Sequence, residues 1–190
     1  MKGKPFTSSY SGMCEVQMAE RDTLSGILAR TVITSAVASA ASAFALMLLA
    51  RRERRGALLP LNATSHWLHG DAAARDATVD VERTAVGALT HHAATMFWSG
   101  MLESILGSGK RKLPALALSG AAVAALAAVV DYALMPRRLS PGWELALTRK
   151  SMAGAFGAMA AGLAAGAFAA RSHGRPLGAE SGSRTRRRRS

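Results

Sequence analysis

The sequence predicts an all-α, polytopic membrane protein: a bundle of four transmembrane helices with a short interfacial helix in the first loop. Four stretches of 18 to 20 residues lack any charged side chain, although 19% of the chain is charged. A helix needs about 20 residues to cross a hydrocarbon core of about 30 Å. Charged residues border each stretch, and the stretches together are rich in Ala and Gly rather than Leu and Ile, as in packed membrane helices. The stretches are Thr31–Ala50, Thr84–Leu102, Leu113–Val130 and Ser151–Ala170.

The 190 residues allow one membrane domain between two polar ends. We divide the chain into a polar N-terminal segment (1–30), a transmembrane domain (31–170) and a basic tail (171–190) that we expect to be disordered. The predicted spans cover about 31–50, 84–106, 113–135 and 151–170.

The net charge of +12 would suggest nucleic acid as the partner of a soluble protein. Here the basic residues outside the tail cluster at the ends of the predicted spans, where they meet anionic lipid headgroups. We therefore expect a bilayer with anionic headgroups as the partner, and no nucleic acid.

Small residues recur every four positions in the first and fourth spans. The first carries Ser35, Ser39 and Ala43, and the fourth carries Gly154, Ala158, Gly162 and Gly166. Such faces let helix backbones approach closely. They predict tight packing within the bundle, and they also make a second copy of the chain a candidate partner.

The loop after the first span contains an apolar segment, Leu58–Gly70, that is too short to cross a bilayer. We expect it to form the short helix on the membrane surface, begun by Asn62 or Thr64 and ended by Gly70. Trp67 would then lie at headgroup depth.

Polar residues gather on one stripe of the second span, which should therefore face other helices rather than lipid. We expect Glu103, at the end of this stripe, to reach the interface and the lysines at 110 and 112. His91 lies about 100° away from the stripe on an ideal helix. The stripe comprises His92, Met96, Ser99 and Glu103, with Thr95 nearby.

The third span ends at Asp131, a costly residue in an apolar helix, which we expect to pair with Arg137 or Arg138. In the loop that follows, Ser140 could cap a helix that begins at Pro141. A type II turn at Pro141 and Gly142 is the alternative.

Alternating direction of successive spans places the first and third loops on one side of the membrane. The polar residues of these loops, and those of the spans next to them, should converge at that face, whereas Glu103 belongs to the opposite face. The candidate polar site comprises His66, His69, Asp71, His91, His92, Asp131, Arg137, Arg138 and Glu144.

The sequence carries no recognisable catalytic motif, P-loop, GxGxxG or HExxH. Cys14 is the single cysteine, so the chain forms no internal disulfide. No cofactor is predicted. The spacing of His66 and His69 with Asp71 is compatible with a metal ion, and His91 or His92 could ligate haem, so a haem- or metal-binding protein remains an alternative.

Three motifs resemble small, uncharacterised four-helix membrane proteins of proteobacteria. They are NATSHWLHGD (62–71), HHAATMFW (91–98) and VDYALMPRRLSPGWE (130–144). The resemblance covers about 55–170 and implies the four-helix architecture, with no established activity attached to it. It also implies a bacterial inner (cytoplasmic) membrane as the location of this multi-pass chain.

These observations favour a non-enzymatic structural or helper protein of the membrane. Permeation of ions, protons or small solutes by an oligomer is one alternative, and a membrane redox protein with haem or metal is another. Lysine and arginine counts are similar on the two sides of the predicted bundle, so the positive-inside rule leaves the orientation open.

Overall fold

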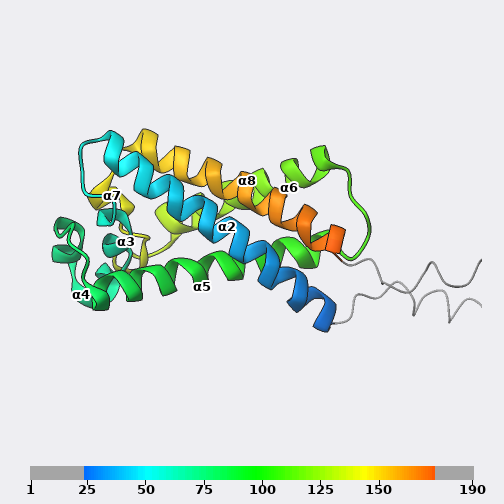
Figure 1. The fold of residues 1–190 in the computed structure, drawn as a ribbon. Helices are drawn as coiled ribbons and strands as arrows, with labels where there is room; N and C mark the ends of the chain where they lie inside the picture. Colours follow the sequence, from blue (N-terminus) through cyan, green and yellow to red (C-terminus); the bar gives the residue numbers. More distant parts are fainter. Residues whose placement is uncertain (1–23, 174–190) are drawn as a thin grey trace, which may run out of the picture.

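The computed structural model describes residues 24–173, which form a bundle of long helices (Figure 1). No strand occurs in this part of the chain, so the all-α prediction is confirmed for it. The helix α6 continues without a break into a π-helical turn, η2 (Val130–Leu134). The long helices are α2 (Leu24–Arg52), α5 (Val81–Leu106), α6 (Leu113–Val129) and α8 (Arg149–His173).

Short helical segments gather at one end of the bundle, on the left of Figure 1. We call this the loop end. The opposite end, where α2 begins and α5 and α8 finish, is called the Glu103 end. The short segments are the α-helices α3 (Leu59–Thr64), α4 (His66–His69) and α7 (Trp143–Ala146) and the 3-10 turns η1 (Asp71–Arg75) and η3 (Arg137–Leu139).

Three helical stretches of the described residues are long and apolar enough to cross a membrane: Leu24–Arg52, Leu113–Leu134 and Arg149–Ser172. They correspond to the first, third and fourth predicted spans. With 26 residues, α5 is long enough to be the second span. It is not among the three because polar residues, two adjacent histidines above all, lower its mean hydropathy.

Two of these helices extend beyond their predicted bounds. The first begins at Leu24 instead of Thr31, and α8 continues through Arg171 to His173. The other residues of the predicted N-terminal segment and basic tail lie outside the described residues.

At the centre of the bundle, α2 packs against α8 on one side and α5 on the other, while α8 also packs against α6 (Figure 1). Two glycines allow the close approach of α8 to α2. A Cβ atom at Gly166 would lie 2.7 Å from the Cα of Thr34, and one at Gly162 would lie 2.7 Å from the Cα of Ala38. The small-residue face of the fourth span is thus occupied by another helix of the same chain.

The helix expected over Leu58–Gly70 is divided into two: α4 carries the exposed Trp67 and Leu68, whereas α3 is buried instead of lying at the surface. Every residue of α3 is buried, and the helix packs against α2, α5 and α7. Leu58 rather than Asn62 or Thr64 precedes its first turn, because both polar side chains bond elsewhere. Gly70 ends α4 with a φ of 71°, as predicted.

In the third loop the turn prediction holds and the Ser140 cap does not. Gly142 has φ 75° and ψ 0°, the values of the third residue of a type II turn, and α7 begins after it at Trp143.

Candidate functional site

Asn62 fixes the first loop over the start of α5. Its amide Nδ2 donates to the carbonyls of Asp76 and Thr78 at 2.9 and 3.0 Å, and its Oδ1 accepts from the Thr84 hydroxyl at 2.7 Å. The side chain is fully buried, so these bonds satisfy its polar atoms. The sequence indicated this residue only as a helix cap, because its partners lie 14 to 22 positions away.

His66 joins the first loop to the third. Its ring is buried, and Nε2 donates to the carbonyl of Ser140 at 2.9 Å. The other ring nitrogen, Nδ1, lies 3.5 Å from a carboxylate oxygen of Asp71. The predicted convergence of the two loops is therefore seen at this residue.

A groove of about 580 Å³ lies beside His66 and is lined by polar residues from both loops. His69, Asp71, Arg137 and Arg138 line it together with His66. The Nε of Arg138 donates to the main-chain carbonyl of Trp67 at 3.3 Å, which connects η3 to α4.

The expected ion pair of Asp131 is not found. Within residues 24–173, the side chain of Asp131 makes no hydrogen bond or ion pair, and Arg138 bonds to a main-chain carbonyl of α4 instead. Asp131, Arg137 and Glu144 line one pocket of about 360 Å³. Glu144 accepts a 2.5 Å hydrogen bond from the hydroxyl of Ser140.

His91, and not His92, faces the interior of the bundle. Its Nε2 lies 3.0 Å from the hydroxyl oxygen of Ser42, which itself donates to the carbonyl of Ala38 at 2.7 Å. The carbonyl of Ser39 lies 3.4 Å from the same nitrogen. Since a carbonyl only accepts, these neighbours assign the proton to Nε2 in the neutral ring.

The buried polar stripe of α5 is consequently His91, Thr95, Ser99 and Glu103. The prediction was correct for Ser99 and Glu103 and wrong for His92 and Met96. His92 is half-buried, and Met96 is 38% exposed.

An aromatic cavity of about 300 Å³ lies at the loop end, between α5, the end of α6, the third loop and α8. His91 and Asp131 both line it, so two of the predicted site residues share one space. Three tryptophans and a phenylalanine form much of the wall. The lining aromatic residues are Trp67, Trp98, Trp143 and Phe156, and the polar ones include Thr64, Thr90 and Thr95.

Two of the tryptophans are fixed by hydrogen bonds of their ring nitrogens. Trp143 Nε1 donates to the hydroxyl of Thr64 at 3.1 Å, and Trp67 Nε1 donates to that of Thr90 at 3.2 Å. The Trp143 ring centroid lies 5.3 Å from that of Phe156.

Among residues 24–173, no three His, Cys, Asp or Glu side chains are placed to hold a metal ion together. Comparison of the chain with known protein families, with curated proteins and with solved structures gave no match. Function is therefore inferred from the arrangement of the side chains.

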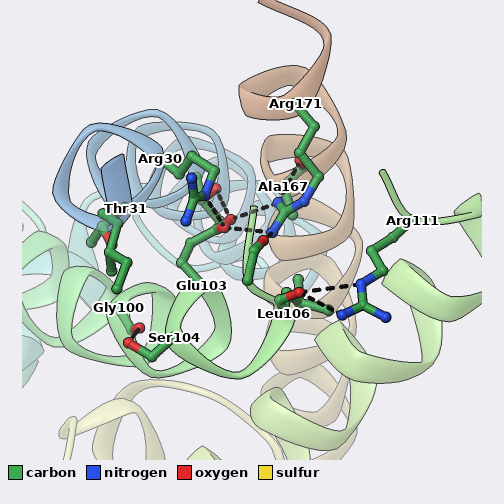
Figure 2. A network of polar contacts seen from close by, with 12 residues as sticks. Arg30, Thr31, Gly100, Glu103, Ser104, Leu106, Arg111, Ala167 and Arg171 are labelled. Carbon is green, nitrogen blue, oxygen red and sulfur yellow. Dashed lines mark hydrogen bonds and ion pairs between the residues drawn. The ribbon is translucent and has the colours of Figure 1, made fainter. Parts of the chain in front are cut away.

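At the Glu103 end, one carboxylate joins three helices (Figure 2). Glu103 is fully buried and lies 2.8 Å from Arg171 of α8 and 3.3 Å from Arg30 of α2. It also accepts a 2.7 Å hydrogen bond from Thr34. We expected Glu103 to reach the lysines of the next loop. This was wrong, because its carboxylate is paired with the two arginines of α2 and α8.

The last turn of α5 is also closed by arginines. Arg111 donates twice to the carbonyl of Leu106, at 2.8 and 3.1 Å (Figure 2). Arg171 donates to the carbonyl of Gly107 at 2.7 Å. These bonds satisfy carbonyls that have no partner inside a helix end.

Glu53 joins the end of α2 to the start of α8. Its carboxylate accepts 2.6 Å hydrogen bonds from the hydroxyls of Ser151 and Thr148. These two bonds hold the pKa of Glu53 below its usual value, because they stabilise the charged form. This role could not be predicted from the sequence, because Glu53 lies among four arginines that indicate the end of a membrane span.

Proposed function

We propose that the chain is an integral membrane protein that crosses the bilayer four times, and that α5 crosses it in addition to α2, α6 and α8. The distribution of residues around α5 carries this proposal. Its four polar residues named above are buried, and two of them, His91 and Glu103, bond to α2 and α8. Its exposed side carries apolar residues, among them Leu89, Phe97 and Ile105, which are 66 to 69% exposed.

A helix of this kind has a low mean hydropathy and still presents an apolar surface to lipid. Polar side chains within a bilayer must find partners inside the protein, because lipid tails offer none. His91 and Glu103 have such partners on α2 and α8, the helices that pass the span criteria. If α5 crosses the bilayer beside α2 and α8, all of these contacts stay inside the protein and away from lipid.

Basic residues at both ends of the bundle support anionic headgroups as partners. Arg51, Arg52 and Arg54 are exposed at the loop end, and Lys110 and Lys112 are exposed at the other. Cations at these positions can contact lipid phosphates. The location that we propose is a bacterial inner membrane.

We further propose a non-enzymatic role. The buried polar groups described above bond mainly to one another and to main-chain carbonyls, so they connect helices. Such use supports a structural or binding protein. A Soret band or a stoichiometric metal in the purified protein would contradict this role and favour the redox alternative.

Labelling of single cysteines tests the four crossings. In a Cys14→Ser background, cysteines replace the exposed Val79, Ser108 and Lys150, and an impermeant maleimide is applied to one side of sealed vesicles. Four crossings require positions 79 and 150 to react from one side and position 108 from the other. If positions 79 and 108 react from the same side, α5 does not cross and the proposal fails.

A further inference from the structure

The aromatic cavity at the loop end contains one charge that the chain leaves unmatched. Asp131 lines the cavity and, within the described residues, its side chain has neither an ion pair nor a hydrogen bond. It is half-buried. A half-buried carboxylate without a partner is costly, and a bound cation would offset that cost.

The two arginines of the third loop do not pair with this carboxylate. Arg137 shares the pocket on the other side of Asp131 with Glu144, so these two charges offset each other. Arg138 donates to the carbonyl of Trp67 instead. Among the residues that line the cavity, Asp131 is therefore the one that carries a charge with no partner to offset it.

Four aromatic side chains line the cavity: Trp67, Trp98, Trp143 and Phe156. Trp67 and Trp143 use their N–H groups on the threonines described above. Because these N–H groups are engaged, the aromatic rings themselves remain for contact with a ligand. An ammonium group within about 6 Å of an aromatic centroid is attracted by the ring quadrupole.

The cavity also has an entrance. Trp67, Ala94 and Leu139 line it and are themselves exposed at the surface of the bundle. Ala94 belongs to α5 and Leu139 to η3, so the opening lies on the flank of the bundle between these segments. A molecule with an apolar part can reach it along this flank.

We propose that this cavity binds a small organic cation: an ammonium ion that carries an apolar or aromatic substituent. The Asp131 carboxylate neutralises the ammonium charge, and the rings of Trp67, Trp98, Trp143 and Phe156 enclose the substituent. The volume of about 300 Å³ lies at the lower end of the range for small-molecule sites, about 300–1,000 Å³. The ligand is thus limited to about one ring with a short ammonium side chain. This site adds a ligand to the proposed membrane protein and does not depend on how often α5 crosses.

Tryptophan fluorescence of the purified full chain in detergent reports directly on this site, because all three tryptophans of the sequence line the cavity. The probe is benzyltrimethylammonium. Its neutral carbon isostere, neopentylbenzene, and the anion benzylsulfonate serve as matched controls at equal mole fraction in the micelles. We expect a saturable change in emission with the cation, and an apparent Kd about tenfold or more higher for the neutral isostere, a factor of ten being about 1.4 kcal/mol.

Two variants assign the charge. Asp131→Asn should raise the Kd of the cation about tenfold or more, whereas Asp131→Glu should retain saturable binding. Glu82→Gln is the matched control, since Glu82 is exposed, lies on α5 and does not line the cavity. Its Kd should equal that of the unchanged chain.

Each of the following results would overturn the proposal: no saturable response of the unchanged chain to the cation, equal affinity for the neutral isostere, or unchanged affinity in an Asp131→Asn protein with native circular dichroism. If Asp131→Asn does not fold, the comparison of cation and isostere on the unchanged chain still decides. Binding of benzylsulfonate in preference to the cation would also contradict it.

Discussion

Substituting Glu103 with glutamine keeps the size of the side chain and removes its charge. In the structure this leaves two guanidinium groups facing each other, with the side chains of Arg171 and Arg30 only 6% and 12% exposed. Breaking a buried ion pair by removing one partner costs about 3–5 kcal/mol, because the remaining charge is left uncompensated. We expect a loss of that size in the free energy of unfolding. The hydrogen bond from Thr34 can persist to the amide oxygen, so the loss reports the missing charge.

The assay is unfolding of the purified protein in mixed micelles with increasing SDS, followed by far-ultraviolet circular dichroism. Glu82→Gln, an exposed carboxylate at the other end of α5, is the control and should lie within about 0.5 kcal/mol of the unchanged chain. Adding Arg171→Gln to Glu103→Gln should cost less than the sum of the two single losses, by about 0.5–3 kcal/mol. A Glu103→Gln protein as stable as the Glu82→Gln control would refute the reasoning.

Two further substitutions test the packing and the connection between α2 and α8. Gly166→Ala places a methyl group 2.7 Å from the Cα of Thr34 and should destabilise the bundle by about 1–3 kcal/mol in the same assay. Gly157→Ala is the control: nothing lies within 4 Å of the added methyl group, so this variant should be neutral or stabilising. Equal losses of stability in the two variants would contradict the packing argument. Because the pKa of Glu53 is lowered by hydrogen bonds, led by that from Ser151, its contribution is present above about pH 4.5 and is lost as the pH falls through the lower native value. The melting temperatures of the unchanged chain and of Glu53→Gln should therefore differ at pH 7 and converge in acid, and a gap that persists in acid would contradict this assignment.

Charge spacing located the long helices because a bilayer span excludes charged residues over a fixed length. The same rule could not predict which residues pair with Glu103. Arg30 and Arg171 lie at the borders of charge-free stretches, so they were assigned to the polar ends of the chain. Their contacts with Glu103 join residues 73 and 68 positions apart, and no local pattern encodes such a separation.

At the loop end, alternating span direction was enough to predict that the first and third loops meet. The bond from His66 to Ser140 and the bond from Trp143 to Thr64 connect them. The burial of α3 could not be read from its sequence, since an apolar segment of this length suits a membrane surface as well as a protein interior. Tertiary hydrogen bonds of Asn62 decide between the two.

The choice between His91 and His92 shows the limit of a helical wheel. The two adjacent stripes that begin at these residues share Ser99 and Glu103, so periodicity alone does not separate them. Packing against α2, where Ser42 accepts from the imidazole, selects His91.

The ion pairs of Glu103 with Arg30 and Arg171 form in a fixed order as the chain is synthesised. Synthesis produces α2 first, then α5 and last α8, so Glu103 meets Arg30 long before Arg171 exists. The first two form a neutral pair that can enter the bilayer together. The arrival of α8 then adds a second positive charge and fixes the end of the last helix to the first two. A nascent chain that stops before Arg171 therefore lacks this final connection between the last helix and the first two.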